Sequence, residues 1–465
     1  MGGVLVSSGA KGYAPRRPLE TALHRGVSEG LPLFLAQAEE HGGVPGFVLR
    51  AVQRFLACGD LSRGFVLVKC DSCEVELKVA FSCRERSVCP SCSARRAALG
   101  AAHLVDHVLP HVAWRQWTLA FPRALRVALL KDELLLGEVL GAFVRAVFAF
   151  QRLRARQLGF VRPLPCAVGF IQNFTSQLLA YPHFHVLFPD GLFEGKDVSF
   201  APLPPPKDEE LEVLLRRVAR RTMKLVNAHF PDGLPYAEDE RDFQLAASAQ
   251  TRLPLADDAP SHRRRGCAFL QGFSLHADTH LHQNDREALE RLCRYGARGP
   301  LCLERLTRRE DGKLEYRLKK PTPHGATVLV LTPLQLLKRL CPLVVKPRLH
   351  LTRFFGALAP NSKWRKLVVP RPPVPPQPAP TGAQLELPAP EAVPRNPTAR
   401  PRLDWAQLLR RTWGFDVFDC PCGGRRRVLA LVTHPDLARK ILGLPSHPRT
   451  RPLPTGPPQL ALPLH

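Results

Sequence analysis

The stretch that decides the fold is Tyr181-Pro182-His183-Phe184-His185-Val186-Leu187-Phe188. Successive side chains of a β-strand point to opposite faces, so the two histidines share one face and the apolar residues between and after them share the other. We therefore predict a strand that begins at about His183, with its apolar face turned toward a hydrophobic core.

Further strands and helices are predicted on both sides of this stretch. Alternation of apolar and polar residues predicts strands over 115–121, 167–174 and 273–281, and a hairpin over 301–331. Helical spacing predicts helices over 93–108, with Ser93 as the N-cap, and over 125–157, 284–298 and 333–341. Helices and strands mix here without a regular strand-helix-strand repeat, which favours an α+β fold with a mainly antiparallel sheet.

The composition bounds the class of protein. The chain has 465 residues and a formal net charge of +25, which argues against an ordinary metabolic enzyme and favours a polyanionic partner such as DNA, RNA or an anionic membrane. The longest apolar stretch, 127–150, contains Lys131, Asp132 and Glu133, so no membrane span is predicted. The N-terminus lacks the apolar core of a secretory signal, and clustered cysteines fit a reducing compartment. We expect a cytoplasmic, nucleoid-associated protein of unknown oligomeric state.

The chain is expected to divide into five parts. They are an N-terminal tail and helix (1–64), a zinc-binding domain (65–108), a catalytic domain (109–367) with an insertion at about 203–266, a Pro-rich linker (368–402) and a small C-terminal region (403–465).

Five cysteines lie close together in the sequence: Cys70, Cys73, Cys83, Cys89 and Cys92. Two C-x-x-C pairs can each supply two thiolates to one tetrahedral zinc ion, and such a closed site is structural rather than catalytic. The spacing leaves open whether Cys83 replaces one of the other four. The basic neighbours Arg84, Arg86, Arg95 and Arg96 are consistent with phosphate contacts.

The histidine pair is a candidate site for a catalytic divalent cation. His183 and His185 share a strand face, and Gln172 in the preceding strand is the best candidate for a third ligand. Such a set, with open positions, suits magnesium or manganese shared with a phosphate. On the pattern alone, a chance pair of histidines is the commoner explanation. A rival set, His276, Asp278, His280 and His282, is better explained as the solvated face of an edge strand.

Tyr295 is the candidate nucleophile. It lies on the helix predicted over 284–298, beside the apolar stripe of that helix. Asn284 and Glu287 have the spacing of a capping box at the start of the helix. Three arginines that could hold DNA phosphates accompany the tyrosine: Arg291, Arg294 and Arg298. Without the histidine pair, an ordinary half-buried tyrosine is the commoner explanation.

The chain resembles a known family in several motifs. The His183-Phe184-His185 motif, followed by Asp190-Gly191, resembles the HUH superfamily of single-strand DNA nucleases. The segment CDSCEVELKVAFSCRERSVCPSCSARR is similar to the zinc-binding N-terminus of rolling-circle insertion-sequence transposases of the IS91 and ISCR group. Further similar segments, spread over about 45–365, are VGFIQNFTSQLLAYPHFHVLFPDGLF, GFSLHA, LERLCRYGARGPL and GALAP.

This resemblance implies a function and its residues. It implies an HUH palm, similar to that of RNA-recognition domains, in a transposase that cleaves and rejoins single-stranded DNA through a 5′-phosphotyrosine at Tyr295. It also implies a magnesium or manganese ion bound by His183, His185 and Gln172. Arg291 stands where two-tyrosine members carry a second tyrosine, which implies a single nucleophile. A C-terminal C-x-x-C is shortened to Cys420-Pro421-Cys422, so no C-terminal zinc site is expected.

Two other classes of function compete with this one. The first is a non-catalytic zinc-dependent DNA-binding protein descended from a transposase. The second is a metal-dependent nuclease that uses water as the nucleophile.

Overall fold

A computed structural model describes residues 16–194, 199–234, 265–322, 325–370, 405–413 and 416–445. Most of the expected Pro-rich linker and part of the expected insertion lie outside these residues. None of the helices within the described ranges is long and apolar enough to cross a bilayer.

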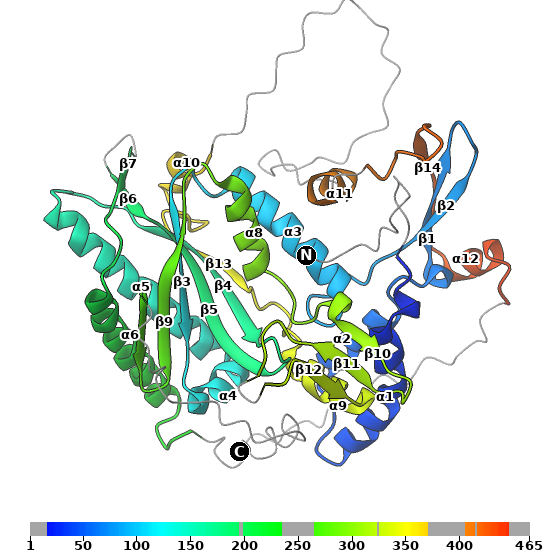
Figure 1. Cartoon of the computed structure of the whole chain (residues 1–465), viewed down its shortest axis with the longest axis horizontal. Coiled ribbons are helices and arrows are strands. Elements are labelled where there is room, and N and C mark those ends of the chain that lie inside the picture. The colour runs from blue at the N-terminus through cyan, green and yellow to red at the C-terminus, as the bar shows by residue number, and fades with distance from the viewer. Residues whose placement is uncertain are drawn as a thin grey trace, which may run out of the picture.

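The central element is a six-stranded antiparallel sheet in the order β13-β4-β5-β3-β9-β8 (Figure 1). Its strands are β3 (Trp114–Ala120), β4 (Cys166–Phe174), β5 (Ala180–Pro189), β8 (Cys267–Leu270), β9 (Phe273–Leu281) and β13 (Thr352–Gly356). The predicted α+β class with an antiparallel sheet is confirmed. β5, which carries the histidine pair, lies between β4 and β3 in the middle of the sheet.

One face of the sheet is covered by helices α4 (Arg123–Lys131), α5 (Glu133–Gln157) and α6 (Asp208–His229). The apolar side chains of β5, among them Phe184, Val186 and Phe188, point into this core, as their alternation predicts. The single helix predicted over 125–157 is wrong. The chain leaves the helix at Asp132, whose carboxylate accepts the N–H groups of Leu134 and Leu135 and so starts α5 afresh.

The opposite face of the sheet is covered by α3 (Pro90–His107) and α8 (Arg286–Gly296), which pack against each other and against β4. Both predicted caps are wrong. α3 begins with Pro90 directly after Cys89, because proline suits the first turn of a helix. α8 is capped by Asp285, whose side chain accepts the N–H of Ala288.

A second core lies beside this domain. It joins the N-terminal helices to a small sheet, β10-β11-β12, that forms from the predicted hairpin and a third strand. Its elements are η1 (Pro18–Glu20), α1 (Ala22–Glu39), α2 (Gly46–Leu56), η3 (Leu303–Arg305), β10 (Leu306–Arg308), β11 (Leu314–Arg317), β12 (Val328–Leu331), α9 (Pro333–Leu340) and η4 (Cys341–Leu343). Two short elements lie elsewhere: the hairpin β6 (Gly191–Glu194) with β7 (Ser199–Pro202), and α10 (Arg365–Val368).

The C-terminal segment returns to the N-terminal part of the chain. Strand β14 (Arg426–Val432) pairs antiparallel with β1 (Phe65–Cys70), which pairs on its other side with β2 (Glu76–Ala80). Figure 1 shows this three-stranded sheet with α12 (Pro435–Ile441) beside it. η2 (Leu61–Arg63) precedes β1, and α11 (Trp405–Trp413) lies near α3.

Candidate active site and cysteine clusters

The sheet brings the predicted histidines and glutamine together. Gln172 on β4 lies directly opposite His183 on β5, and Thr118 on β3 lies directly opposite His185. Directly opposed residues of an antiparallel pair project from the same face of the sheet. The three candidate ligands therefore share the face that α8 covers.

Hydrogen bonds orient all three side chains. His183 lies with Nδ1 at 2.9 Å from the carbonyl of Tyr181, an acceptor only, so its proton is on Nδ1 and its Nε2 keeps a lone pair. Nδ1 of His185 is 3.0 Å from Oγ1 of Thr118. Gln172 donates from Nε2 to the carbonyls of Tyr295 and Gly296, at 2.7 and 3.0 Å. In each side chain these contacts leave one polar atom over: Nε2 of His183, Nε2 of His185 and Oε1 of Gln172.

Two of these polar atoms are buried and without a partner. Oε1 of Gln172 and Nε2 of His185 find no hydrogen-bond partner among the residues that the structure describes. Buried polar atoms are nearly always satisfied, so two polar atoms without partners on one face suggest an absent ligand. Imidazole nitrogen and amide oxygen both bind divalent cations, and the residues present thus fit a metal ion.

Burial keeps both imidazoles neutral. Desolvation, with smaller contributions from the charges of His183 and Arg298, lowers the pKa of His185 to about 3. Desolvation also lowers the pKa of His183. A neutral imidazole is the form that binds metal ions, so the site is ready for a cation at neutral pH.

Tyr295 lies at the exposed side of this site. Its ring centroid is 5.6 Å from that of His185, and the two histidine rings are 4.9 Å apart. The tyrosine is 39% exposed, whereas His185 is 6% exposed. The guanidinium of Arg298 lies 4.7 Å and the ammonium of Lys319 lies 5.4 Å from the centroid of the tyrosine ring. A phenol and two cations therefore border the histidine pair.

The three arginines predicted to accompany Tyr295 have different surroundings. Arg298 lies over the rings of both Tyr295 and Phe174. Arg294 pairs with Glu290, and Arg291 pairs with Glu287, each at 3.5 Å. Of the three, Arg298 is the one that borders the site. Sequence reasoning did not identify Thr118 or Lys319, because neither belongs to a recognisable motif.

The rival set on β9 does not gather around a point. His276 contacts the thiol of Cys267 through Nδ1 at 2.8 Å, and His280 contacts the carboxylate of Asp190 at 3.2 Å. Within the described part of the chain, these residues belong to no group that could hold a metal ion. β9 is also not an edge strand, because β8 and β3 flank it.

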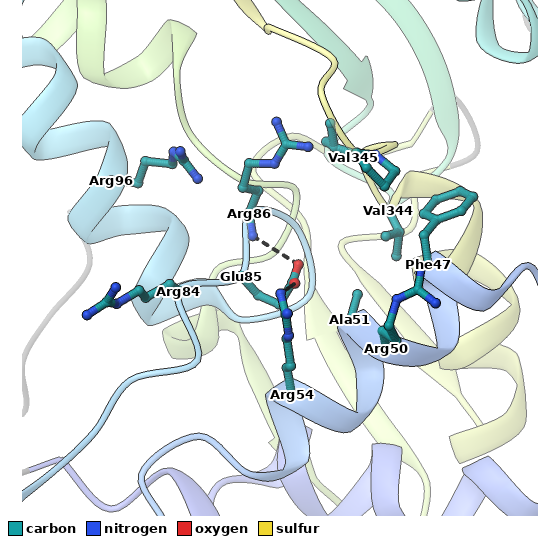
Figure 2. A pocket seen from close by; sticks show the side chains of 11 residues that line it. Phe47, Arg50, Ala51, Arg54, Arg84, Glu85, Arg86, Arg96, Val344 and Val345 are labelled. Carbon is teal, nitrogen blue, oxygen red and sulfur yellow. Dashed lines mark hydrogen bonds and ion pairs between the residues drawn. The ribbon is translucent and has the colours of Figure 1, made fainter. Parts of the chain in front are cut away.

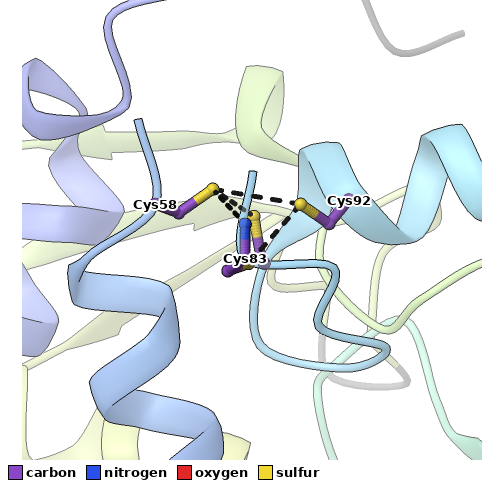
Figure 3. Close-up of side chains that lie close together, drawn as sticks. Cys58, Cys83 and Cys92 are labelled. Carbon is purple, nitrogen blue, oxygen red and sulfur yellow. Dashed lines mark hydrogen bonds between the residues drawn. The ribbon is translucent and has the colours of Figure 1, made fainter. Parts of the chain in front are cut away.

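Four cysteines form a first thiol cluster: Cys58, Cys83, Cys89 and Cys92. Figure 3 labels Cys58, Cys83 and Cys92 of this cluster. Their sulfur atoms all lie within 4.8 Å of one another, with 3.4 Å between Cys83 and Cys92 and 3.7 Å between Cys58 and Cys89. Tetrahedral zinc, with bonds of about 2.3 Å, places its sulfurs about 3.8 Å apart. Hydrogen bonds from the other three thiols lower the pKa of Cys92, which favours a thiolate within the cluster.

A second thiol cluster contains Cys70, Cys73, Cys420 and Cys422. The prediction that the two C-x-x-C pairs share one zinc ion is therefore wrong. The pairs are separated because Cys70 ends β1, whereas Cys89 directly precedes α3. Cys83 is a full member of the first cluster. Cys58 was missed because it is a single cysteine after α2, with no motif around it.

A basic cavity of about 240 Å³ lies beside the first cluster, and we call it the arginine pocket (Figure 2). Its lining includes five arginines and one acidic residue: Arg50, Arg54, Arg84, Arg86, Arg96 and Glu85. The pocket includes three of the four arginines predicted to contact phosphates; Arg95 does not line it. Arg86 also donates to the carbonyls of Leu349 and Lys346, at 2.8 and 2.6 Å. Five guanidinium groups against one carboxylate make a site for an anion.

A cationic pocket and a site that fits a divalent cation, present in one chain, are typical of enzymes that process nucleic acids. Comparison with protein families specifies the class. Residues 166–365 match the family described as "Putative transposase", and residues 32–121 match the family described as "Transposase zinc-binding domain". The chain belongs to the IS91-type transposases with an N-terminal zinc-binding domain. It is therefore a DNA-cleaving enzyme, and DNA is its partner. No curated protein and no solved structure matches the chain.

The matched zinc-binding domain contains all four thiols of the first cluster. Four cysteines with tetrahedral spacing make a closed coordination sphere, which holds zinc as a structural ion. Of the second cluster, the matched domain contains Cys70 and Cys73 but not Cys420 or Cys422.

Proposed function

We propose that this transposase cleaves and rejoins single-stranded DNA at the ends of its element through a covalent 5′-phosphotyrosine on Tyr295. His183, His185 and Gln172 would hold the magnesium or manganese ion that the reaction requires. The observation that carries the proposal is the position of the Tyr295 ring, 5.6 Å from the ring of His185, which has a buried nitrogen without a partner, as Gln172 has a buried oxygen.

A bound divalent cation supplies Lewis-acid stabilisation of negative charge on a phosphate oxygen. The side chains of the protein prepare the site for it. Thr118 fixes the ring of His185, and the carbonyl of Tyr181 fixes the tautomer of His183. Gln172 connects two parts of the site, because it lies opposite His183 in the sheet and its amide nitrogen donates to the carbonyl of Tyr295.

The proposed reaction exchanges one phosphate ester for another. The phenol oxygen of Tyr295 attacks phosphorus and loses its proton, the bond from phosphorus to the 3′ oxygen breaks, and that oxygen gains a proton as a 3′-hydroxyl. A 3′-hydroxyl of another strand then attacks the phosphotyrosine and releases the phenol. Because each step conserves an ester bond, rejoining needs no ATP. Arg298 and Lys319 lie where they can hold the phosphate charge near the phenol.

The arginine pocket extends the proposed DNA surface to the zinc-binding domain. Guanidinium groups bind phosphate oxygens in bidentate geometry, and such contacts position DNA without reading its sequence. All five arginines lie within the matched zinc-binding domain: Arg50 and Arg54 on α2, Arg84 and Arg86 on the loop before α3, and Arg96 on α3. The zinc ion would thus hold the loop that presents Arg84 and Arg86 to the pocket.

The test uses single-stranded oligonucleotides that tile both flanks of the coding sequence, labelled at the 5′ or 3′ end and incubated with the protein and Mn²⁺. We expect a protein–DNA adduct that survives denaturing electrophoresis, carries the 3′ label and is lost in Tyr295→Phe. Tyr181→Phe is the matched control, because Tyr181 lies beside His183 with ring centroids 5.5 Å apart, yet only its carbonyl takes part in the proposed site.

Other outcomes would support the competing functions. Binding of every oligonucleotide without cleavage favours a non-catalytic zinc-dependent DNA-binding protein. Cleavage that persists in Tyr295→Phe favours a nuclease that uses water. We also expect His183→Ala to abolish cleavage and to spare DNA binding; equal loss of both would contradict a catalytic role for the histidine pair.

A further inference from the structure

The second thiol cluster joins two parts of the chain that are far apart in sequence. The sulfur of Cys70 lies 3.6 Å from that of Cys422, and the sulfur of Cys73 lies 3.6 Å from that of Cys420. A disulfide would require about 2.05 Å, whereas tetrahedral zinc spaces its sulfurs at about 3.8 Å. All four sulfurs lie within 4.8 Å of one another, and all four thiols are free. The spacing therefore fits a four-thiolate metal ion.

The backbone on both sides of the cluster is shaped to bring the thiols together. On the C-terminal side, Cys420 and Gly424 form a tight turn in which Gly424 also donates its N–H to the sulfur of Cys422, at 3.4 Å. On the N-terminal side, the amide of Asp71 donates to the carbonyl of Arg425 at 3.0 Å. The turn of one segment is thus hydrogen-bonded to the turn of the other.

Gly424 shows how closely the two turns approach. A Cβ atom at this position would lie 2.3 Å from Oγ of Ser72 and 3.0 Å from the sulfur of Cys70. Any larger residue would push the two turns apart and open the cluster. The contact therefore has the close fit of a built site rather than of four thiols that happen to lie on neighbouring loops.

The hydrophobic core beneath this sheet is small. Its buried members are Phe65, Val432 and Ala438, and five consecutive residues of β14, from Arg427 to Leu431, are exposed. A core of this size contributes little toward closing a loop of more than 300 residues, so another source of stability is needed. Binding of a structural zinc ion can supply it, because the free energy of metal binding becomes free energy of folding.

We propose that Cys70, Cys73, Cys420 and Cys422 hold a second structural zinc ion, which fastens the C-terminal segment to the zinc-binding domain. Four soft thiolates in tetrahedral arrangement select zinc over magnesium or manganese. The same C-terminal segment is anchored at a second point, where Arg411 on α11 pairs with Asp106 on α3 and with Glu290 on α8, at 3.0 and 2.6 Å. The second ion thus secures a segment that contacts the helix of Tyr295.

The first test counts zinc in the purified full-length chain by elemental mass spectrometry. We expect two zinc ions per chain in the wild type, one in Cys420→Ser/Cys422→Ser, and one in Cys58→Ser/Cys92→Ser. Cys302→Ser is the matched control, because Cys302 is partly exposed and belongs to neither cluster; it should keep both ions. A wild type with one zinc, or two ions retained in Cys420→Ser/Cys422→Ser, would overturn the proposal.

The second test does not depend on how well a variant folds. In the native wild type, we expect alkylation by iodoacetamide to spare Cys73 and Cys422, although both are exposed, and to modify them once a chelator has removed the zinc. Hydrogen exchange of the β14 amides should accelerate under the same treatment, while the pairing of β1 with β2 persists. Rapid alkylation of Cys73 and Cys422 in the zinc-loaded chain would refute the second site.

Discussion

Gln172 has two roles to test: it donates hydrogen bonds to α8, and its Oε1 is a proposed metal ligand. Replacing Gln172 should change both the free energy of unfolding and the affinity for Mn²⁺, and the contacts give an expected size for each change. Gln172→Ala removes two hydrogen bonds from a side chain that is 2% exposed, those to the carbonyls of Tyr295 and Gly296. Each such bond contributes a net of about 0.5–1.5 kcal/mol, so their loss should lower the free energy of unfolding by about 1–3 kcal/mol. Urea titration of the zinc-loaded chain measures this change.

The second role of Gln172 depends on Oε1, which we propose as a metal ligand. Gln172→Ala removes this oxygen and should weaken Mn²⁺ binding at least tenfold, equivalent to about 1.4 kcal/mol. Gln172→Glu keeps an oxygen that can take the place of Oε1 but loses both donations, so it should bind Mn²⁺ at least as tightly as the wild type while unfolding at lower urea. Titration of the zinc-loaded chain with Mn²⁺, followed by electron paramagnetic resonance, measures the affinity.

A buried glutamine elsewhere provides the control. Gln151 on α5 donates one hydrogen bond to the carbonyl of Pro189 at 3.2 Å, and Gln151→Ala should lower stability without changing Mn²⁺ affinity. If Gln172→Ala binds Mn²⁺ as tightly as the wild type, Gln172 is no ligand and the proposed three-residue site is refuted. Unchanged stability in Gln172→Ala would show that its hydrogen bonds to α8 do not hold the helix.

Three further predictions concern other contacts. Thr118→Val removes the hydrogen-bond partner of Nδ1 of His185 and should lower the affinity of the site for Mn²⁺ by 10- to 100-fold, whereas Thr118→Ser should keep it, as the same titration would show. The carboxylates of Asp132 and Glu138 accept hydrogen bonds from the ring of His229 and raise its pKa above 6.5, so the stability that this contact adds is full below pH 6.5 and is lost as pH rises through the raised value. The difference in free energy of unfolding between the wild type and His229→Gln should therefore shrink with rising pH; a difference that grows would contradict the assignment. Arg54→Ala in the arginine pocket should reduce the slope of log affinity for DNA against log salt concentration by about 1, whereas Arg216→Ala, at an exposed side chain of α6, should not change it.

Four of the six strands of the central sheet, with the candidate metal ligands that they carry, could be predicted from the sequence, whereas β8 and β13 were not predicted. Alternation along β4 and β5 places Gln172, His183 and His185 on one face, since a strand has a period of two and a short return turn sets the neighbour. The helix of Tyr295 could be predicted from its apolar stripe, but its position over the histidines depends on packing between distant segments. The break at Asp132 was missed because the apolar pattern continues across it.

The cysteines show where sequence spacing misleads. Two C-x-x-C pairs within one short segment favour a shared ion, yet β1 and α3 direct Cys70 and Cys89 to different places. The partners that complete the clusters, Cys58 and the Cys420–Cys422 pair, have no local signal that links them to either pair. Only the pairing of β14 with β1, across more than 300 residues, reveals the second cluster.

The separation of the second cluster has a consequence during biosynthesis. Cys73 and Cys420 are 347 positions apart, so at about 5–20 residues per second a ribosome needs roughly 20–70 s after Cys73 before it adds the partner thiol. The first cluster, from Cys58 to Cys92, is complete within a few seconds of its first member. The nascent transposase therefore matures in two stages, and its second stage must wait until the segment that carries Cys420 and Cys422 has been translated.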